Sequence, residues 1–388
     1  MFAVFTRIRK LFLPVLLLPV FLLAGCQGGP VIGSGPSVGP SAPVPVALLV
    51  PYGASDPNEQ KLAEDLENAA RMAVSDLAGV KVDLSVYDTA GNADKAREAA
   101  RAAVGGGARI IIGPLRAESA TAAADAVAPR GVNVLAFSND PTIAGDNLFV
   151  LGQTFHSTAD RLVRFATGQG RDRILTVYAD NRAGRLGRQA IQQAITRNAA
   201  VPAGGVSYAF SQDAVVEAVP RIRSAAEDNS ANAIFFTANS AGALPLFTQM
   251  LPEAGLGQDE VQYIGLSRWD TPPQTLELPG VQGGWFALPD PQRTAQFRER
   301  FETAYGRPPH ALSGLAYDGI AAVGALAKEG GNLGRDALTQ PAGFQGVNGI
   351  FRFTPDGTNE RGLAVATIRD KAVEVISPAP ASFGRAGL

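Results

Sequence analysis

The only cysteine of the chain, Cys26, is the residue whose chemistry is most clearly indicated by its position. Three basic residues, Arg7, Arg9 and Lys10, precede an apolar run over residues 11–23, which is too short to span a bilayer. Small residues then lead to the thiol. This order predicts an export signal rather than a transmembrane helix, and it places the rest of the chain outside the cytoplasm.

The stretch Leu23-Ala24-Gly25-Cys26 resembles the lipobox of bacterial lipoproteins. The resemblance implies that residues 1–25 are a signal peptide removed before Cys26, and that the Cys26 thiol is acylated and anchors the protein to a membrane. In that family an Asp directly after the cysteine retains the protein at the inner membrane. Gln27 stands there instead, so the resemblance predicts the periplasmic face of the outer membrane.

Residues suited to catalysis are few. Gly35-Pro36-Ser37-Val38-Gly39 matches the nucleophile-elbow pattern of hydrolases, but it lies in a Gly/Pro/Ser-rich segment without the strand and helix that the motif needs. The two histidines, His156 and His310, are far apart and outside any metal-ligand spacing, and capping or packing roles suit both. We therefore predict a non-enzymatic protein with no catalytic residue, no metal site and no cofactor.

The composition narrows the class of partner. The chain has 34 Lys+Arg and 36 Asp+Glu, and the signal holds three of the basic residues, so the remainder carries about (34 − 3) − 36 = −5 charges. A weakly acidic surface argues against nucleic acid, whose phosphates need basic patches. Residues 26–45 are Gly, Pro and Ser with almost no charge, and they predict a flexible tether. The 46% of hydrophobic residues suffices for a large core.

From Val46 onward, short apolar runs alternate with helical patterns. Ile110-Ile111-Ile112 is typical of a strand buried on both faces, and Asp56-Pro57 is typical of a helix start, with Asp56 as the N-cap. Strands that alternate with helices predict parallel sheets covered on both faces, an α/β doubly wound design. After residue 287 two helices come in sequence, and a turn at Pro355-Asp356-Gly357 then predicts an antiparallel ending.

These local sequences, in this order, resemble the type I periplasmic-binding-protein fold, in particular its leucine/isoleucine/valine-binding branch. The segments that carry the resemblance are Val46 to Pro51, Tyr87-Asp88-Thr89, Ile112-Gly113-Pro114-Leu115, Ala136-Phe137-Ser138-Asn139, Tyr317-Asp318 and Phe353 to Gly357. Two of them also look like the carboxy-terminal domain of penicillin-binding-protein activators, outer-membrane lipoproteins that stimulate peptidoglycan synthases. The resemblance implies two lobes joined by three crossovers: lobe one at 46–154 and 288–345, lobe two at 155–287 and 346–378, then a tail at 379–388.

In doubly wound sheets the ligand site lies beyond the carboxyl ends of the strands, which here means a cleft between the lobes. Hydroxyls and helix N-termini suit an anion, and Ser119 with Ser138 to Asp140 is the nearest match to the loops with which the family holds a ligand carboxylate. Turn-shaping by Ser138 and Asn139, and packing by Trp269, are the alternatives. The full set of cleft candidates is Arg116, Ser119, Ser138, Asn139, Asp140, Arg182, Arg185, Ser267 and Trp269.

Two functions remain open. The loop at Ser267-Arg268-Trp269 lacks the acidic group with which the family pairs an α-amino group, and Ala183-Gly184 replaces its aromatic-Gly pair. We therefore favour a penicillin-binding-protein activator, a lipoprotein whose partner is a peptidoglycan synthase or another envelope protein. The alternative is a solute-binding receptor of an ABC transporter, with an amino acid or similar small molecule in the cleft.

Overall fold

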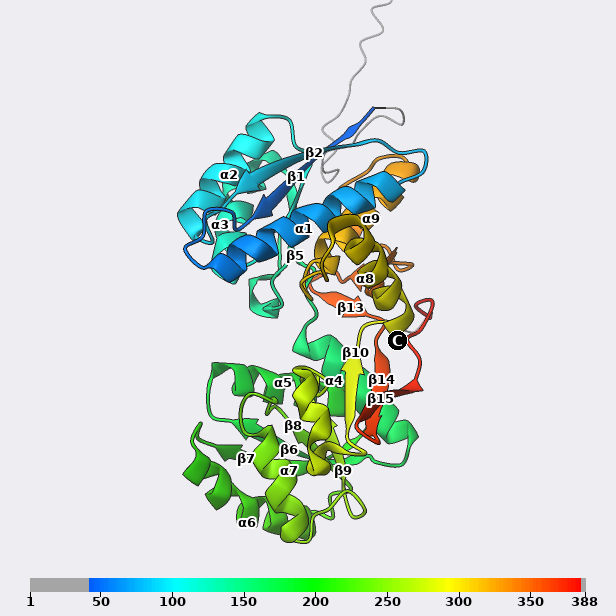
Figure 1. Cartoon of the computed structure of the whole chain (residues 1–388). Helices are drawn as coiled ribbons and strands as arrows, with labels where there is room; N and C mark the ends of the chain where they lie inside the picture. The colour runs from blue at the N-terminus through cyan, green and yellow to red at the C-terminus, as the bar shows by residue number, and fades with distance from the viewer. Residues whose placement is uncertain (1–41, 385–388) are drawn as a thin grey trace, which may run out of the picture. The chain divides into compact units, whose positions relative to one another are not determined.

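The computed structural model describes residues 42–384, shown as a ribbon in Figure 1. The predicted signal peptide, the acylated Cys26 and nearly all of the predicted tether lie outside the described residues, so these predictions stay untested. Within the described part, no helix combines the length and the apolar character that a membrane crossing needs.

Lobe one is built on a five-stranded parallel sheet with the strand order β2-β1-β3-β4-β5. The chain enters it two residues earlier than the apolar pattern predicts, at Val44. Ile110 to Ile112 is buried along its whole length, which confirms the strand expected there. The strands are β1 (Val44–Val50), β2 (Val82–Asp88), β3 (Ile110–Ile112), β4 (Asn133–Ala136) and β5 (Leu148–Val150).

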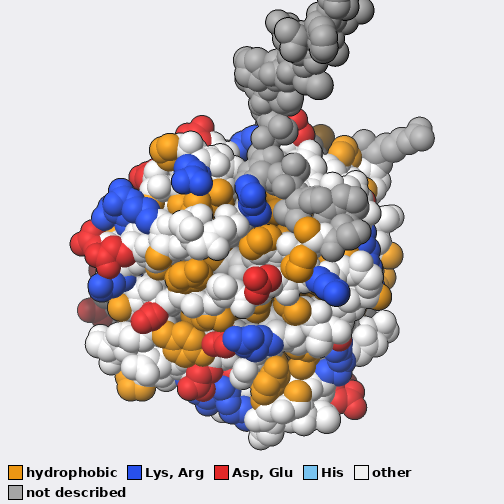
Figure 2. All heavy atoms as spheres, turned by 90° about the horizontal axis from the view of Figure 1, so that it is seen from above, with side chains coloured by type: hydrophobic (Ala, Val, Ile, Leu, Met, Phe, Trp, Pro, Cys, Tyr) orange, Lys and Arg blue, Asp and Glu red, His pale blue; other side chains and the backbone are white. Residues whose placement is uncertain are grey.

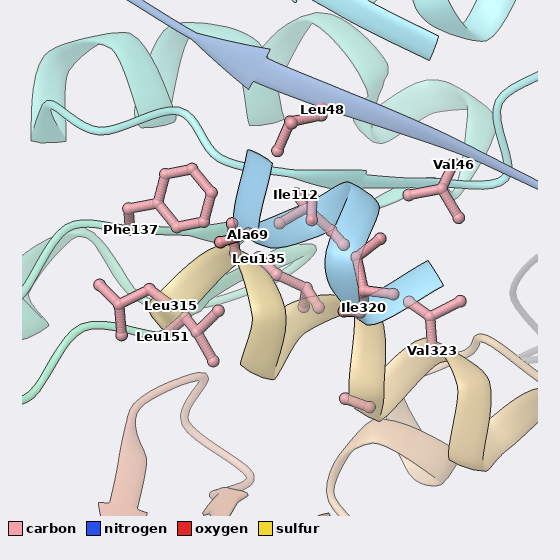
Figure 3. Packing of buried hydrophobic residues seen from close by; sticks show 14 of the residues in the cluster. Val46, Leu48, Ala69, Ile112, Leu135, Phe137, Leu151, Leu315, Ile320 and Val323 are labelled. Carbon is pink, nitrogen blue, oxygen red and sulfur yellow. The ribbon is translucent and has the colours of Figure 1, made fainter. Parts of the chain in front are cut away.

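Helices cover both faces of this sheet because successive side chains of a strand point to opposite sides. Leu48 of β1 faces a core that it shares with the helices over residues 57–76 and 314–328. The second of these helices supplies Ile320 (Figure 3). Leu49, the neighbour of Leu48, faces the opposite core. Asp56 caps the first helix by accepting a hydrogen bond from the Asn58 backbone N–H at 2.9 Å, as predicted. The helices of lobe one are α1 (Pro57–Asp76), α2 (Ala93–Gly105), α3 (Ala117–Val127), α8 (Pro291–Tyr305), α9 (Gly314–Lys328) and α10 (Arg335–Leu338), with the short turns η1 (Ala128–Arg130) and η2 (Pro141–Ile143).

Lobe two has a seven-stranded sheet with the order β15-β14-β10-β9-β8-β6-β7. Five strands are parallel, whereas β14 and β15 are antiparallel to their neighbours, as the chain's ending predicts. Its strands are β6 (Arg173–Ala179), β7 (Val201–Tyr208), β8 (Ala233–Phe236), β9 (Gln262–Gly265), β10 (Trp285–Leu288), β14 (Ala364–Arg369) and β15 (Ala372–Ser377). Its helices are α4 (Phe155–Gly168), α5 (Arg182–Arg197), α6 (Gln212–Asp228) and α7 (Leu244–Glu253), with the turns η3 (Pro273–Glu277) and η4 (Pro279–Val281).

A small antiparallel sheet follows α10, formed by β11 (Phe344–Gly346), β12 (Gly349–Phe353) and β13 (Asn359–Arg361). The predicted boundary at residues 345/346 assigns most of this sheet to lobe two. The structure differs, because Phe351 and Phe353 are buried in the same core as β1 and α9 of lobe one. The chain therefore reaches lobe two for the last time between Arg361 and Ala364.

The three crossovers between the lobes follow β5, β10 and β13, and a buried ion pair lies among them. Arg361 donates from Nη1 to Asp318 Oδ2 at 3.0 Å and from Nε to the Leu151 carbonyl in the first crossover at 3.2 Å. Asp318 also accepts from the Val347 backbone N–H at 2.9 Å. Asn359 donates to the Val150 carbonyl at 2.7 Å. The carboxylate of Asp318 is therefore committed to structural hydrogen bonds.

Candidate functional site

The predicted site residues come from four loops, each of which follows the carboxyl end of a parallel strand. Arg116 and Ser119 follow β3, and residues 138–140 follow β4, so both groups lie at one edge of the sheet in lobe one. Arg182 and Arg185 open α5 after β6, and residues 267–269 follow β9, at the corresponding edge in lobe two. We call these segments the four site loops.

In lobe one the site loops are partly committed to internal contacts. The Ser138 side chain is buried, and its Oγ accepts from the Asp140 backbone N–H at 3.1 Å, so it shapes the turn. Asn139 beside it is exposed. Arg116 forms an ion pair with Glu59 of α1. Ser119 is 1% exposed, and its Oγ has no hydrogen-bond partner within residues 42–384.

One ion pair joins the site loops of the two lobes. Arg182 at the start of α5 donates from Nη2 to Asp140 Oδ2 at 2.9 Å. Partial burial raises the pKa of Asp140, but hydrogen bonds from Thr142 and the positive charge of Arg182 outweigh it and leave the pKa below its usual value. The carboxylate is therefore ionised at neutral pH and faces the cation of the opposite lobe.

In lobe two the last site loop contains an acidic residue that the sequence reasoning missed. Asp270 accepts two hydrogen bonds from the guanidinium of Arg268, at 2.8 and 2.5 Å. The sequence does carry the signal, because Asp270 stands directly after Trp269 and two positions after Arg268 in the same loop. Ser267 donates to the Ala238 carbonyl at 3.3 Å, and Arg185 pairs with Asp180 at 2.8 Å.

Trp269 does not offer its ring to a ligand in this structure. It is 0% exposed and packs in the core of lobe two. Gly265 of β9 and Gly284 before β10 form a slot for the indole, because a Cβ atom on either glycine would collide with the ring. In this structure the indole packs within lobe two and holds the last site loop against its core.

A second feature absent from the sequence reasoning is Phe210, which follows β7 at the same edge of the sheet as Arg182. Its side chain is 73% exposed, although large apolar side chains are usually covered. Together with Tyr208, Val215 and Pro245 it lines an apolar pocket of about 390 Å³. This is an aromatic surface next to the site loops.

A groove of about 530 Å³ lies beside the hinge and is lined by Thr142 of lobe one, by α4 and α5, and by the β12–β13 turn. None of the nine candidates lines it. Within it Asp160 accepts from Arg164 at 2.7 Å and from Arg197 at 3.0 Å, so this carboxylate is already paired.

Residues 42–384 contain no group of three or more His, Cys, Asp or Glu side chains placed to hold a metal ion. His156 shares a 2.5 Å hydrogen bond with Gln193, and the His310 ring accepts from the Leu312 backbone N–H at 3.1 Å. On the face drawn in Figure 2, acidic and basic side chains are interspersed. That face shows no basic patch of the kind that binds nucleic acid.

Comparison with solved structures gives the same fold in transport proteins. The branched-chain amino acid ABC transporter periplasmic ligand-binding protein of Burkholderia xenovorans is 18% identical, with 87% of this chain and 95% of that chain covered and a TM-score of 0.68. An ABC transporter substrate-binding protein from Desulfitobacterium hafniense in complex with Leu is 20% identical, with coverage of 86% and 100% and a TM-score of 0.62.

A third structure is the solute binding protein of an ABC transporter from Rhodopseudomonas palustris, in complex with 3,4-dihydroxybenzoic acid. It is 18% identical, with coverage of 86% and 96% and a TM-score of 0.56. A search of curated protein sequences gives no significant match. The family model for periplasmic binding proteins matches residues 43–372, which include both lobes and all four site loops. This chain therefore belongs to the periplasmic binding protein family.

Proposed function

We propose that this protein is a solute-binding receptor of an ABC transporter and that its ligand is an amino acid or another small carboxylate. The observation that carries the proposal is the contact between Asp140 and Arg182, which brings site loops of both lobes together at 2.9 Å. Arg182 is 76% exposed, so its guanidinium can exchange Asp140 for a ligand carboxylate at little cost. A guanidinium binds a carboxylate through two parallel hydrogen bonds.

The acidic residues of the site supply the second half of a zwitterion site. Asp140, once released from Arg182, and Asp270 in the last loop are the groups that would balance a ligand ammonium, which needs a compensating anion when it leaves water. The last loop therefore does contain an acid, Asp270, which a ligand ammonium would have to share with Arg268. The ligands of the related proteins, Leu and 3,4-dihydroxybenzoic acid, share a carboxyl group but not an ammonium.

The receptor is better supported than the activator of peptidoglycan synthases that the sequence alone favours. The activator hypothesis rests on two short motifs, on the poor match of the amino-acid site loops, and on Gln27 and the tether, which lie wholly or almost wholly outside the described residues. The related structures are proteins of ABC transporters. A location on the periplasmic side of a membrane, with a lipid anchor at Cys26, accords with the family and remains part of the proposal.

Thermal unfolding of residues 27–388 tests the proposal, since this chain holds both complete cores. The panel contains amino acids, aromatic acids and peptidoglycan fragments. A ligand at 100 times its Kd stabilises the native state by about 2.7 kcal/mol. A rise in Tm with one class of carboxylate supports the receptor. No shift with any amino or aromatic acid, together with a shift for a peptidoglycan fragment, would overturn it.

Matched arginine variants then locate the site. Arg182→Gln removes the cation, and because hydrogen bonds to charged groups contribute about 1.5–3 kcal/mol, we expect the Kd to rise about 10- to 100-fold. Arg223→Gln is the control, because Arg223 lies on α6 in an exposed pair with Glu227. Titration calorimetry with the ligand found in the panel measures both. Equal affinities of the two variants for the ligand would show that Arg182 does not bind it.

A further inference from the structure

The chain crosses the hinge once more after the three crossovers. Beyond β15, in lobe two, residues 378–384 run on as a segment that we call the strap (Figure 1). Its beginning is held by Arg161 of α4, which donates to Ser377 Oγ at 2.6 Å and to the Pro378 carbonyl at 3.4 Å. The strap therefore starts from a fixed point in lobe two.

The strap then passes over the third crossover and ends on the small sheet that packs with lobe one. A Cβ atom on Gly362, in the crossover, would lie 3.1 Å from Pro380 Cγ. The Phe383 ring packs against Gly343, where an added Cβ would lie 2.9 Å from its Cε2. The guanidinium of Arg352 on β12 lies 4.6 Å from the centroid of the same ring. Lobe two is thus attached to the lobe-one side at a fourth place.

This fourth attachment differs in kind from the crossovers. The crossovers are covalent and lie among the buried bonds of Asp318 and Arg361. The strap is held at its far end by one half-buried aromatic ring and one cation–π contact. Such a contact can open and re-form without unfolding either lobe, because Phe383 belongs to none of the buried clusters. Of the strap residues only Ala379, near the end in lobe two, packs against one of them.

We propose that the strap is a reversible brace across the hinge that narrows the range of angles between the two lobes. The brace acts through the Phe383–Arg352 contact: when the ring leaves Gly343 and Arg352, the lobes gain freedom to rotate about the crossovers. The inference concerns the fold and is independent of which ligand the site loops bind.

Spin labels test the brace directly. Residues 27–388 contain no cysteine, so Arg101→Cys on α2 and Glu217→Cys on α6, both exposed, introduce one label in each lobe. Pulsed electron–electron double resonance then gives the distribution of the distance between the two labels in the absence of ligand. Three chains are compared: one with the intact strap, one that ends at Ser377, and Phe383→Ala. Val375→Ala on β15, which is exposed and lies before the strap, is the control.

We expect a broader distribution in the shortened chain and in Phe383→Ala, and the original width in Val375→Ala. Hydrogen exchange should quicken in both strap variants at the Gly343 and Arg352 amides while the core strands β1 and β8 keep their protection. Should the shortened chain fail to fold, Phe383→Ala alone decides the question. Distributions that superimpose on, or are narrower than, the original in folded variants would overturn the proposal.

Discussion

One ion pair lies among the crossovers on the lobe-one side, another joins the site loops of the two lobes, and their surroundings are opposite. Asp318 and Arg361 are 0% and 3% exposed, among the crossovers. Asp140 and Arg182 are 17% and 76% exposed, between the site loops. The N–O distances, 3.0 and 2.9 Å, are nearly equal. Solvent access and the number of further bonds to each partner, rather than the distance, distinguish the two pairs.

Because of this difference the buried pair is a fixed part of the hinge, whereas the exposed pair can exchange its partners. Taking two charges out of water costs several kcal/mol per ion, and the interior pair offsets this only through additional hydrogen bonds, which Leu151 and Val347 provide. An exposed pair gains less than about 1 kcal/mol and can change partners. The proposed receptor would need both: a hinge whose parts stay together, and charges between the lobes that a ligand can take over.

The largest effect is expected from breaking the buried pair. Arg361→Met leaves the Asp318 carboxylate without its cation and the Leu151 carbonyl without its donor, so the free energy of unfolding should fall by about 3–5 kcal/mol. Urea unfolding measures it. Arg369→Met, in the exposed pair with Glu374 on the edge of lobe two, is the control and should change little.

A double variant sharpens the same comparison. If the cost comes from an uncompensated buried charge, then Asp318→Leu combined with Arg361→Met should be less destabilising than the sum of the two single changes. An additive result would mean that the two side chains act separately. The pair would then not be the unit that holds the crossovers together.

A smaller effect is expected inside lobe two, where the last site loop has its own fixed anchor. Gly284→Ala places a methyl group in the slot of Trp269, and overpacking of a core costs about 1–3 kcal/mol. Because φ at Gly284 is not positive, the cost is steric and not one of backbone strain. Calorimetric unfolding measures it. Gly168→Ala is the control, because nothing lies within 4 Å of its Cβ position. Gly79→Ala is unsuitable, because φ there is +77° and an alanine would strain the backbone.

The sequence predicts well those features that depend on neighbouring residues. The cap at Asp56, the buried strand at Ile110–Ile112 and the alternation of strands with helices follow from local spacing, and the structure confirms them. The α/β class follows from that alternation, because a helix that connects two strands as a crossover places them in parallel and covers a face of the sheet.

Features that depend on distant residues could not be predicted in this way. Phe351 and Phe353 read as part of lobe two by their order in the chain, but their rings pack with strands some 300 positions earlier. Trp269 reads as a candidate for stacking, and only the pairing of β9 with β10 brings Gly265 and Gly284 around it. The contact between Asp140 and Arg182 joins residues 42 positions apart in different lobes. Hence the site loops were predictable and the pairing between them was not.

The smallest effect is expected at the exposed pair, and it depends on pH. Because the pKa of folded Asp140 is below its usual value of 3.8, the unfolded chain takes up the proton first as the pH falls. The stabilisation from the ionised carboxylate is therefore complete above about pH 4 and is lost as the pH falls through the folded pKa. Asp140→Asn should lower the free energy of unfolding by less than about 1 kcal/mol, equally from pH 8 to pH 5.

Below about pH 4 the difference between Asp140→Asn and the original chain should shrink, because Asp140 is protonated first in the unfolded chain; it vanishes once folded Asp140 is protonated too. Thermal unfolding at pH 8, 5 and 3.5 measures the trend, with Asp180→Asn as the matched control, since Asp180 forms an exposed pair with Arg185 within one lobe. A loss of several kcal/mol in Asp140→Asn at pH 7 would contradict the comparison. The contact between the lobes would then be as structural as the hinge pair, and a ligand would have to break it at a cost that its own bond to Arg182 could not offset.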